Sequence, residues 1–319
     1  MCGLAGIVGE VDLMEQVLLH MSAAQNHRGK ETPNSWVSSF IDARVGLMHN
    51  RMKTIDMAVA PKQPFEDNDT GLVVMLDGEI FNYEDVRRQL ENYYSFTTRG
   101  MCEVITKAYD RFEGYFSIVI YNRWSEELLL CRDRFGIKPL YYATQRGNLF
   151  FASEIKALFA GGIRPLLSAE RWASYLAYST YGSPYETFWE GVHQLPAGFL
   201  LHYNGYSLVE KRWYEFEKRV SLWSEESPER LPEAFLEQMH RSVGYSLMGE
   251  MEKGLSLNGS LESALFISLM KEIGLPRSLK SYMHYRGKLH QSGVLWSAEM
   301  LAETPLPMEQ VKITKSMLL

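Results

Sequence analysis

The chain opens with the decapeptide MCGLAGIVGE (residues 1–10), in which an apolar run between glycines directly follows Cys2. Such a run predicts a buried strand that pins the N-terminus inside a sheet. A residue as small as cysteine allows the initiator methionine to be trimmed, which leaves a thiol and an α-amine on one residue. The thiolate is a nucleophile, and an α-amine with a pKa of about 7.7 to 8.0 can act as its base. Cys2 is therefore a candidate nucleophile with its own base, although a Met-Cys start also arises by chance.

Outward from this strand, helical and strand patterns alternate over the first 200 residues or so. Hydrophobic residues at helical spacing predict helices at 12–24, 83–93 and 102–112, and Val, Ile and Tyr-rich runs predict strands at 45–52, 71–82, 115–122 and 127–133. The segment 139–153 repeats strand, polar turn and strand around Gly147. Short polar turns between consecutive strands are typical of antiparallel hairpins, so we expect an α+β domain.

A change of composition divides the chain. Residues 212–232 lose hydrophobic periodicity and gain charge and proline, which predicts a linker between a first domain at 1–211 and a second at 233–319. The second part alternates helix, strand, turn and helix, which is typical of an α/β unit.

Composition narrows the class of protein. The chain has 319 residues, 46% hydrophobic and 23% charged, with a formal net charge of −6 and no long basic block, which argues against a nucleic-acid partner. Three widely separated cysteines predict neither a disulfide framework nor a metal site, and fit the cytoplasm. The sequence predicts neither a leader peptide nor an apolar run long enough to span a membrane.

Several short segments together resemble the glutamine-dependent asparagine synthetase family. In chain order they are MCGLAGIVG, HRG, HNRMKTIDM, DGEIFN, CEV, RDRFGIKPLYYA, FASEIKAL, LPAG and SLNGSLESA. The resemblance implies an N-terminal-nucleophile hydrolase fold, a four-layer αββα sandwich, followed by a partial α/β domain with a parallel sheet. It covers the whole class II glutamine amidotransferase domain and only the opening of the ATP-pyrophosphatase-type synthetase domain.

The resemblance assigns roles to particular residues. Cys2 becomes the nucleophile that forms a thioester with glutamine, and the Gly78 amide becomes a donor of the oxyanion hole. Arg51 is expected to bind the α-carboxylate of glutamine, and Glu79 its ammonium group. The backbone of Met52, Thr54 and Ile55 is expected to shape the pocket.

Two positions depart from the family pattern in this pocket. Asp77 stands where the family has an asparagine, and an ionised carboxylate cannot donate to an oxyanion as an amide does. Because one lost oxyanion donor costs on the order of 100-fold to 1000-fold in turnover, Asp77 predicts weak glutaminase activity. Met101 stands where the family has an aspartate that pairs with the ammonium of glutamine, so a substrate without that charge would be tolerated.

The phosphate loop of the second domain also departs from the pattern. Asn258, Gly259, Ser260, Leu261, Glu262 and Ser263 stand where the family has Ser-Gly-Gly-x-Asp-Ser. Leu257, directly before them, is counted with this degenerate nucleotide-binding loop. A side chain at Ser260 obstructs the close approach of a pyrophosphate that a glycine permits. We therefore expect ATP with Mg²⁺ only if this degenerate loop functions or a partner chain supplies the site. The glutaminase step itself is expected to need no cofactor.

The other matching segments are interpreted as architecture. His27 is expected to be a structural histidine, and Glu154 to lie at the start of a helix. The segment RDRFGIKPLYY is interpreted as a buried turn and an aromatic strand, and Cys102 and Cys131 as small buried hydrophobic residues.

Three functions stay open from the sequence. The first is a class II amidotransferase that passes ammonia to a ligase on a partner chain, or within a homo-oligomer. The second is a pseudoenzyme of the same fold that serves as a binding or scaffold subunit. The third is an N-terminal-cysteine amidase or acyl-transfer enzyme that acts on a substrate other than glutamine, such as a related amide.

Overall fold

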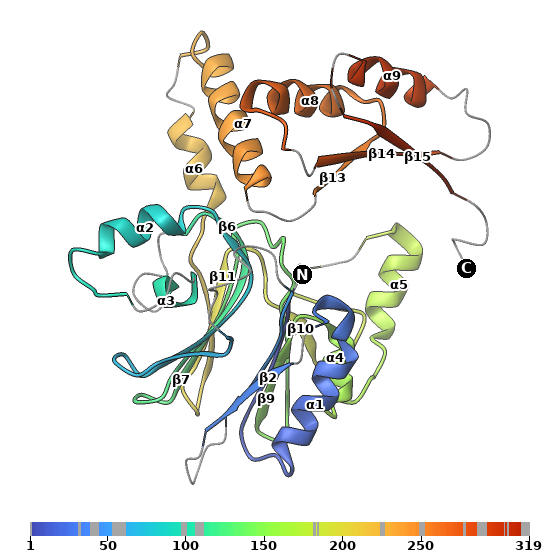
Figure 1. Ribbon diagram of the computed structural model, residues 1–319. Helices are drawn as coiled ribbons and strands as arrows, with labels where there is room; N and C mark the ends of the chain where they lie inside the picture. Colours follow the sequence, from blue (N-terminus) through green and yellow to red (C-terminus); the bar gives the residue numbers. More distant parts are fainter. Residues whose placement is uncertain are drawn as a thin grey trace. The chain divides into compact units, whose positions relative to one another are not determined.

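The computed structural model describes residues 2–30, 33–38, 45–52, 62–96, 101–105, 112–180, 183, 185–223, 227–248, 253–276, 279–285, 292–302, 304 and 306–313. They divide into two compact units, the first reaching Lys218 and the second beginning at Arg219 (Figure 1). Each unit has its own hydrophobic core.

Two six-stranded antiparallel sheets form the centre of the first unit. In spatial order, the first sheet contains β10 (Val192–Gln194), β8 (Tyr141–Gln145), β9 (Asn148–Ala152), β1 (Gly3–Val8), β3 (Val45–Asn50) and β2 (Asn34–Val37). The second contains β12 (Leu208–Arg212), β11 (Phe199–Tyr203), β7 (Glu127–Arg132), β6 (Gly114–Asn122), β5 (Leu72–Ile80) and β4 (Phe65–Asp67). The opening apolar run is thus a strand in the interior of a sheet, as the sequence predicts.

Alternation along the central strands explains why the two sheets stack. Successive side chains of a strand point to opposite faces. On β1, Leu4 and Val8 pack into the core that the two sheets share, whereas Ala5 and Ile7 pack against the helices outside. Both faces of these strands are therefore buried, which requires a layer on each side of each sheet.

Helices supply the two outer layers. α1 (Met14–Ala24) and α4 (Ile155–Ala160) cover the first sheet, and α2 (Tyr83–Leu90) and α3 (Met101–Ile105) cover the second (Figure 1). The unit also contains the 3₁₀ turn η1 (Asn26–Arg28) and α5 (Ala169–Tyr178), whose N-terminus is capped by the Ser168 hydroxyl. The arrangement confirms the four-layer αββα sandwich.

The second unit contains a three-stranded parallel sheet in the order β13 (Lys253–Leu257), β14 (Leu279–Tyr285) and β15 (Met308–Lys312). Its helices are α7 (Leu231–Leu247), α8 (Leu261–Ile273) and α9 (Ser292–Leu301). This confirms the predicted partial α/β unit.

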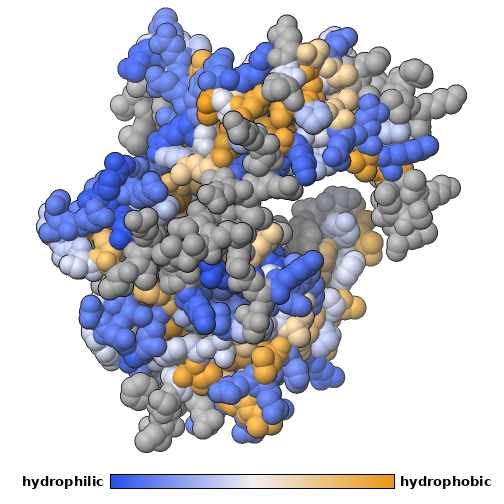
Figure 2. Space-filling model, in the orientation of Figure 1, coloured by the Kyte–Doolittle hydropathy of each residue, from blue (hydrophilic) through white to orange (hydrophobic). Residues whose placement is uncertain are grey.

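Hydrophobic residues gather on the visible face of the second unit, whereas the visible surface of α2 in the first unit is largely hydrophilic (Figure 2).

The segment 212–232 contains α6 (Phe216–Trp223), and the two units divide inside it, between Lys218 and Arg219. The domain limits at 1–211, 212–232 and 233–319 stay a prediction.

Candidate active site

Cys2 lies immediately before β1, where the sheet fixes its backbone. The Leu4 amide donates to Ser153 Oγ at 2.9 Å, and the Ser153 amide donates to Leu4 O at 2.9 Å. These two bonds tie the first residues of β1 to the end of β9. The Cys2 sulfur lies 3.5 Å from the amide nitrogen of Met52, which donates to it.

Asp77 lies on β5, directly against the backbone of Cys2. Its Oδ1 accepts from the Cys2 nitrogen at 3.0 Å and lies 3.3 Å from Lys138 Nζ. Its Oδ2 accepts from Arg28 Nη2 at 2.7 Å. The Asp77 side chain is 0% exposed, and those of Arg28 and Lys138 are 6% and 8% exposed. A buried carboxylate is tolerated only when it is paired, and two cations and an N–H group pair this one.

Arg28, in η1, joins Cys2 to a second acidic residue. Its Nε donates to the Cys2 carbonyl at 2.8 Å, and its Nη1 lies 3.4 Å from Glu154 Oε1. Glu154 is the N-cap residue of α4, and its carboxylate lies 2.7 Å from His27 Nε2. Burial raises the pKa of Glu154, but hydrogen bonds from Lys156 and His27 outweigh it and lower the pKa overall. His27 and Glu154 thus support Arg28.

Lys138 reaches the site from the turn between β7 and β8. Its amide donates to Asp133 Oδ2 at 2.9 Å, and the same carboxylate accepts from the amides of Phe135 and Ile137. This turn carries the lysine side chain to Asp77 and places its Nζ 5.2 Å from the centre of the Tyr115 ring. Lys138 is a site residue that the sequence interpretation of RDRFGIKPLYY as architecture missed.

Gly78 and Glu79 follow Asp77 on β5. Gly78 has a φ of 141°, and a Cβ built there would lie 2.0 Å from the Tyr115 carbonyl oxygen, so only glycine fits. Glu79 Oε2 accepts from the Tyr115 hydroxyl at 2.8 Å. Burial, together with this bond to Glu79, raises the pKa of Tyr115. Met101, at the start of α3, has its sulfur 3.4 Å from the Ile80 amide, so it lies beside the strand that carries Glu79.

Arg51 and Met52 directly follow β3, at the end of the sheet where Cys2 lies. Thr54 and Ile55 lie outside the described residues. His49, on β3, is fully buried, and its Nε2 lies 3.3 Å from the Leu76 carbonyl oxygen. Burial lowers the pKa of His49 to about 4, so it is neutral in the folded protein at pH 7.

The environment keeps the Cys2 thiol protonated near neutral pH. Burial is the main cause that raises the pKa of Cys2 above 9.0, and the charge of Asp77 raises it further. The Met52 amide and Lys138 lower it without reversing the direction. The thiol therefore needs a base before it can act as a nucleophile.

In the second unit, the predicted phosphate loop joins β13 to α8. After Leu257, Asn258 Oδ1 accepts from the Ser260 amide at 3.0 Å and from Ser263 Oγ at 2.9 Å. Ser260 Oγ accepts from the Ser263 amide at 3.4 Å, Gly259 has a φ of 75°, and Glu262 is exposed in the first turn of α8. The amides of Ser260 and Ser263 are thus bonded to side chains of the same loop. Whether the loop holds a nucleotide stays a prediction.

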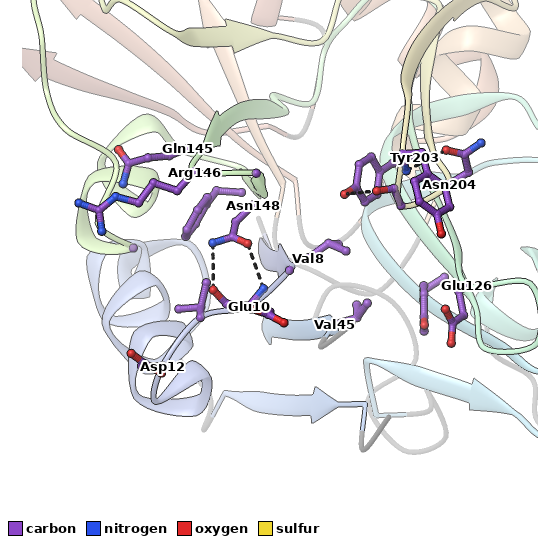
Figure 3. Close-up of a pocket in the computed structure, with 18 residues that line it drawn as sticks. Val8, Glu10, Asp12, Val45, Glu126, Gln145, Arg146, Asn148, Tyr203 and Asn204 are labelled. Atoms are coloured by element: carbon purple, nitrogen blue, oxygen red, sulfur yellow. Dashed lines mark hydrogen bonds between the residues drawn. The ribbon is translucent and has the colours of Figure 1, made fainter. Parts of the chain in front are cut away.

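A polar cavity of about 710 Å³ lies at the other end of β1 (Figure 3). Asn148 closes part of its wall, accepting from the Glu10 amide at 2.9 Å and donating to the Glu10 carbonyl at 3.0 Å. Since β1 has six residues, this cavity lies roughly 20 Å from Cys2. None of the predicted site residues lines it.

The residues with described positions contain no helix that is both long and apolar enough to cross a bilayer. They also contain no group of three or more His, Cys, Asp or Glu side chains placed to hold a metal ion.

The amino-acid sequence is similar to those of known proteins. A family described as "Glutamine amidotransferase domain" matches residues 1–214. Asparagine synthetase [glutamine-hydrolyzing] 2 of Bacillus subtilis (strain 168) is 33% identical over 295 residues, which cover 83% of this chain and 38% of that protein. Amidase chry2 of Gibberella zeae is 27% identical over 267 residues, which cover 77% of this chain and 37% of that protein. The chain thus spans less than half the length of these relatives.

Solved structures agree on the fold. A glutamine phosphoribosylpyrophosphate amidotransferase from B. subtilis, complexed with ADP and GMP, aligns with a TM-score of 0.51 and 14% identity. The alignment covers 100% of this chain and 92% of that one. With the match over residues 1–214 and the sandwich that carries Cys2, the chain belongs to the asparagine-synthetase-like, class II glutamine amidotransferase family.

Proposed function

We propose that this chain hydrolyses the side-chain amide of glutamine through the thiol of Cys2, after removal of Met1, and passes on the ammonia. The observation that supports this most is the position of Cys2 at the end of a central strand. There its nitrogen lies 3.0 Å from Asp77 Oδ1 and its sulfur 3.5 Å from the Met52 amide. Both atoms of the proposed nucleophile–base unit are thus held by the sheets.

The chemistry follows from the protonated thiol. The α-amine takes the thiol proton as the sulfur attacks the carboxamide carbon, and the proton then goes to the leaving nitrogen. The C–N bond breaks, ammonia leaves, and a thioester on Cys2 remains. A water molecule attacks this thioester, which releases glutamate and regenerates the thiol.

The residues around Cys2 would bind the substrate and its oxyanion. The Gly78 amide is the proposed oxyanion donor, because both oxygens of Asp77 already accept hydrogen bonds. Arg51 is assigned to the α-carboxylate of glutamine and Glu79 to its ammonium group. Met52, Thr54 and Ile55 are assigned to the pocket wall.

The amide-forming step is assigned to a partner chain or to another copy in a homo-oligomer. In this proposal the glutaminase step uses no cofactor. ATP and Mg²⁺ would serve only the amide-forming step, and the internally bonded loop at Asn258–Ser263 favours a site on the partner.

Release of glutamate from glutamine tests the proposal. The wild-type protein is expected to release glutamate, and Cys2→Ser is expected to abolish the release. Cys131→Ala, on β7, is the matched control and is expected to keep it. Equal rates for wild type and Cys2→Ser would contradict the proposal.

A second candidate is an amidase for an amide that lacks the free ammonium group of glutamine. Met101 favours it, since a thioether beside β5 cannot compensate a buried ammonium ion. The likeness to a relative named an amidase also favours it. Hydrolysis of N-acetylglutamine faster than glutamine would support this candidate, and hydrolysis of neither by a Met1-trimmed, folded protein would support the scaffold function.

A further inference from the structure

One oxygen of Asp77 faces two nitrogens from distant parts of the chain. Oδ1 lies 3.0 Å from the Cys2 nitrogen and 3.3 Å from Lys138 Nζ, while Oδ2 accepts from Arg28. All three side chains that meet here are buried. The carboxylate is therefore shared between the backbone of Cys2 and two buried cations.

We propose that Asp77 is a positioning residue that holds the α-amine of Cys2, and that Lys138 and Arg28 balance its charge. The inference rests on the proposed removal of Met1, after which the nitrogen that now donates to Oδ1 becomes the amine. Asp77 then fixes the base next to the thiol and is not a defective oxyanion donor.

The positive charges of Lys138 and Arg28 explain how the Cys2 α-amine can act as a base beside the Asp77 carboxylate. An opposite charge in contact favours the protonated amine and raises its pKa by about 1 to 3 units. A carboxylate alone would keep the amine protonated near neutral pH. Lys138 and Arg28 oppose this effect, because like charges disfavour the protonated amine.

Charged and titratable groups come to this region from several elements. They are Arg28 (η1), His49 (β3), Arg51 (after β3), Asp77 and Glu79 (β5), Cys102 (α3), Tyr115 (β6), Lys138 (the β7–β8 turn) and Glu154 (before α4). The pKa of the Cys2 thiol responds to two of them, since Asp77 raises it and Lys138 lowers it. The amine on the same residue is subject to the same two charges.

The test is a titration of the Cys2 amine itself, by NMR of the Met1-trimmed protein labelled with ¹⁵N-cysteine. An amine nitrogen is resolved from the amide nitrogens of Cys102 and Cys131. Lys138→Met is expected to raise the pKa of the amine, because Asp77 loses one counter-ion. Adding Asp77→Asn to Lys138→Met is expected to lower it again, by about one unit or more.

Lys156→Met is the matched control, since it removes a lysine that is 53% exposed and pairs with Glu154. It is expected to leave the pKa of the amine unchanged. A purely structural role for Asp77 would not produce shifts of opposite sign in the two variants.

Equal pKa values of the amine in Lys138→Met and in the double variant would overturn the proposal, as would a retained Met1. If the double variant does not fold, the absence of a rise in Lys138→Met alone would overturn it. The titration needs no glutamine hydrolysis. Shifts of the expected signs in a protein that releases no glutamate would therefore support the positioning role while contradicting the proposed function.

Discussion

At the scale of single residues, Asp77 connects the buried charges of the site to Cys2. Its carboxylate is fully buried and pairs with Arg28 and Lys138, which are also buried. Removing the carboxylate from such a cluster leaves a buried cation without this compensating charge. The resulting loss of stability is larger than the net contribution of the intact ion pair.

We therefore expect Asp77→Asn alone to lower the free energy of unfolding by about 3 to 5 kcal/mol, because buried Lys138 loses its partner carboxylate and Arg28 loses one of two. Urea unfolding of the purified variant measures this. Asp12→Asn, at an exposed position, is the control and should unfold like the wild type. An unchanged midpoint for Asp77→Asn would show that this carboxylate does not compensate the two cations.

The buried imidazole of His49 predicts a pH dependence of stability. Its pKa in the folded protein is about 4, below the ordinary value of 6.5, so the unfolded chain binds the proton first as the pH falls. Stability is therefore lost between about pH 6.5 and pH 4, by roughly 3 kcal/mol from this group. Protonation would also create an Nδ1–H for which the described residues offer no acceptor.

His49→Gln is expected to reduce the loss of stability between pH 7 and pH 4, because it removes this titration. Denaturant unfolding at both pH values measures the difference. His20→Gln, at an exposed position of α1, is the control. The same pH dependence in wild type and His49→Gln would contradict the prediction.

At the scale of elements, the pairing of β5 with β6 sets the shape of the site. Gly78 lies opposite Phe116 in this ladder, and a Cβ at Gly78 would meet the Tyr115 carbonyl oxygen at 2.0 Å. Backbone cannot yield as a flexible side chain does, so the strands would have to separate where Asp77 and Glu79 lie.

Gly78→Ala is therefore expected to destabilise the protein far more than Gly147→Ala does. Both glycines have positive φ, but nothing lies within 4 Å of a Cβ built at Gly147. In Gly147→Ala, the expected loss of stability is only the backbone strain of about 1 to 2 kcal/mol. Thermal unfolding of the two variants compares them, and equal midpoints would contradict the close approach of β5 and β6.

The elements themselves were largely predictable from the sequence. Alternation and short polar turns predict β5, β6, β7 and the β8–β9 hairpin, because these signals depend on residues close together in the chain. The site was predictable only in part. The contact of Lys138 with Asp77 joins residues 61 positions apart (138 − 77), and no local pattern encodes it. A signal was present, because an aspartate inside an apolar strand requires a counter-charge.

At the scale of the whole molecule, the described residues of the two units form separate hydrophobic cores. The second unit packs β13, β14, α8 and α9 around residues such as Leu257, which is 0% exposed. The first unit closes its core between its own two sheets.

Leu257→Ala is expected to destabilise the second unit by about 2 to 5 kcal/mol through loss of buried contacts and a new cavity. Since the cores are separate, amide hydrogen exchange should increase in residues 253–313 and remain unchanged in β1 and β5. Equal increases in both units would show that they unfold as one cooperative body.

Mass spectrometry with 6-diazo-5-oxo-norleucine tests whether Cys2 is an N-terminal nucleophile in a glutamine pocket. This glutamine analogue alkylates an amidotransferase cysteine. We predict a Met1-trimmed chain with a single adduct on Cys2, blocked by excess glutamine and absent in Cys2→Ser. A folded chain that retains Met1, or a trimmed chain whose Cys2 stays unmodified, would contradict the claim.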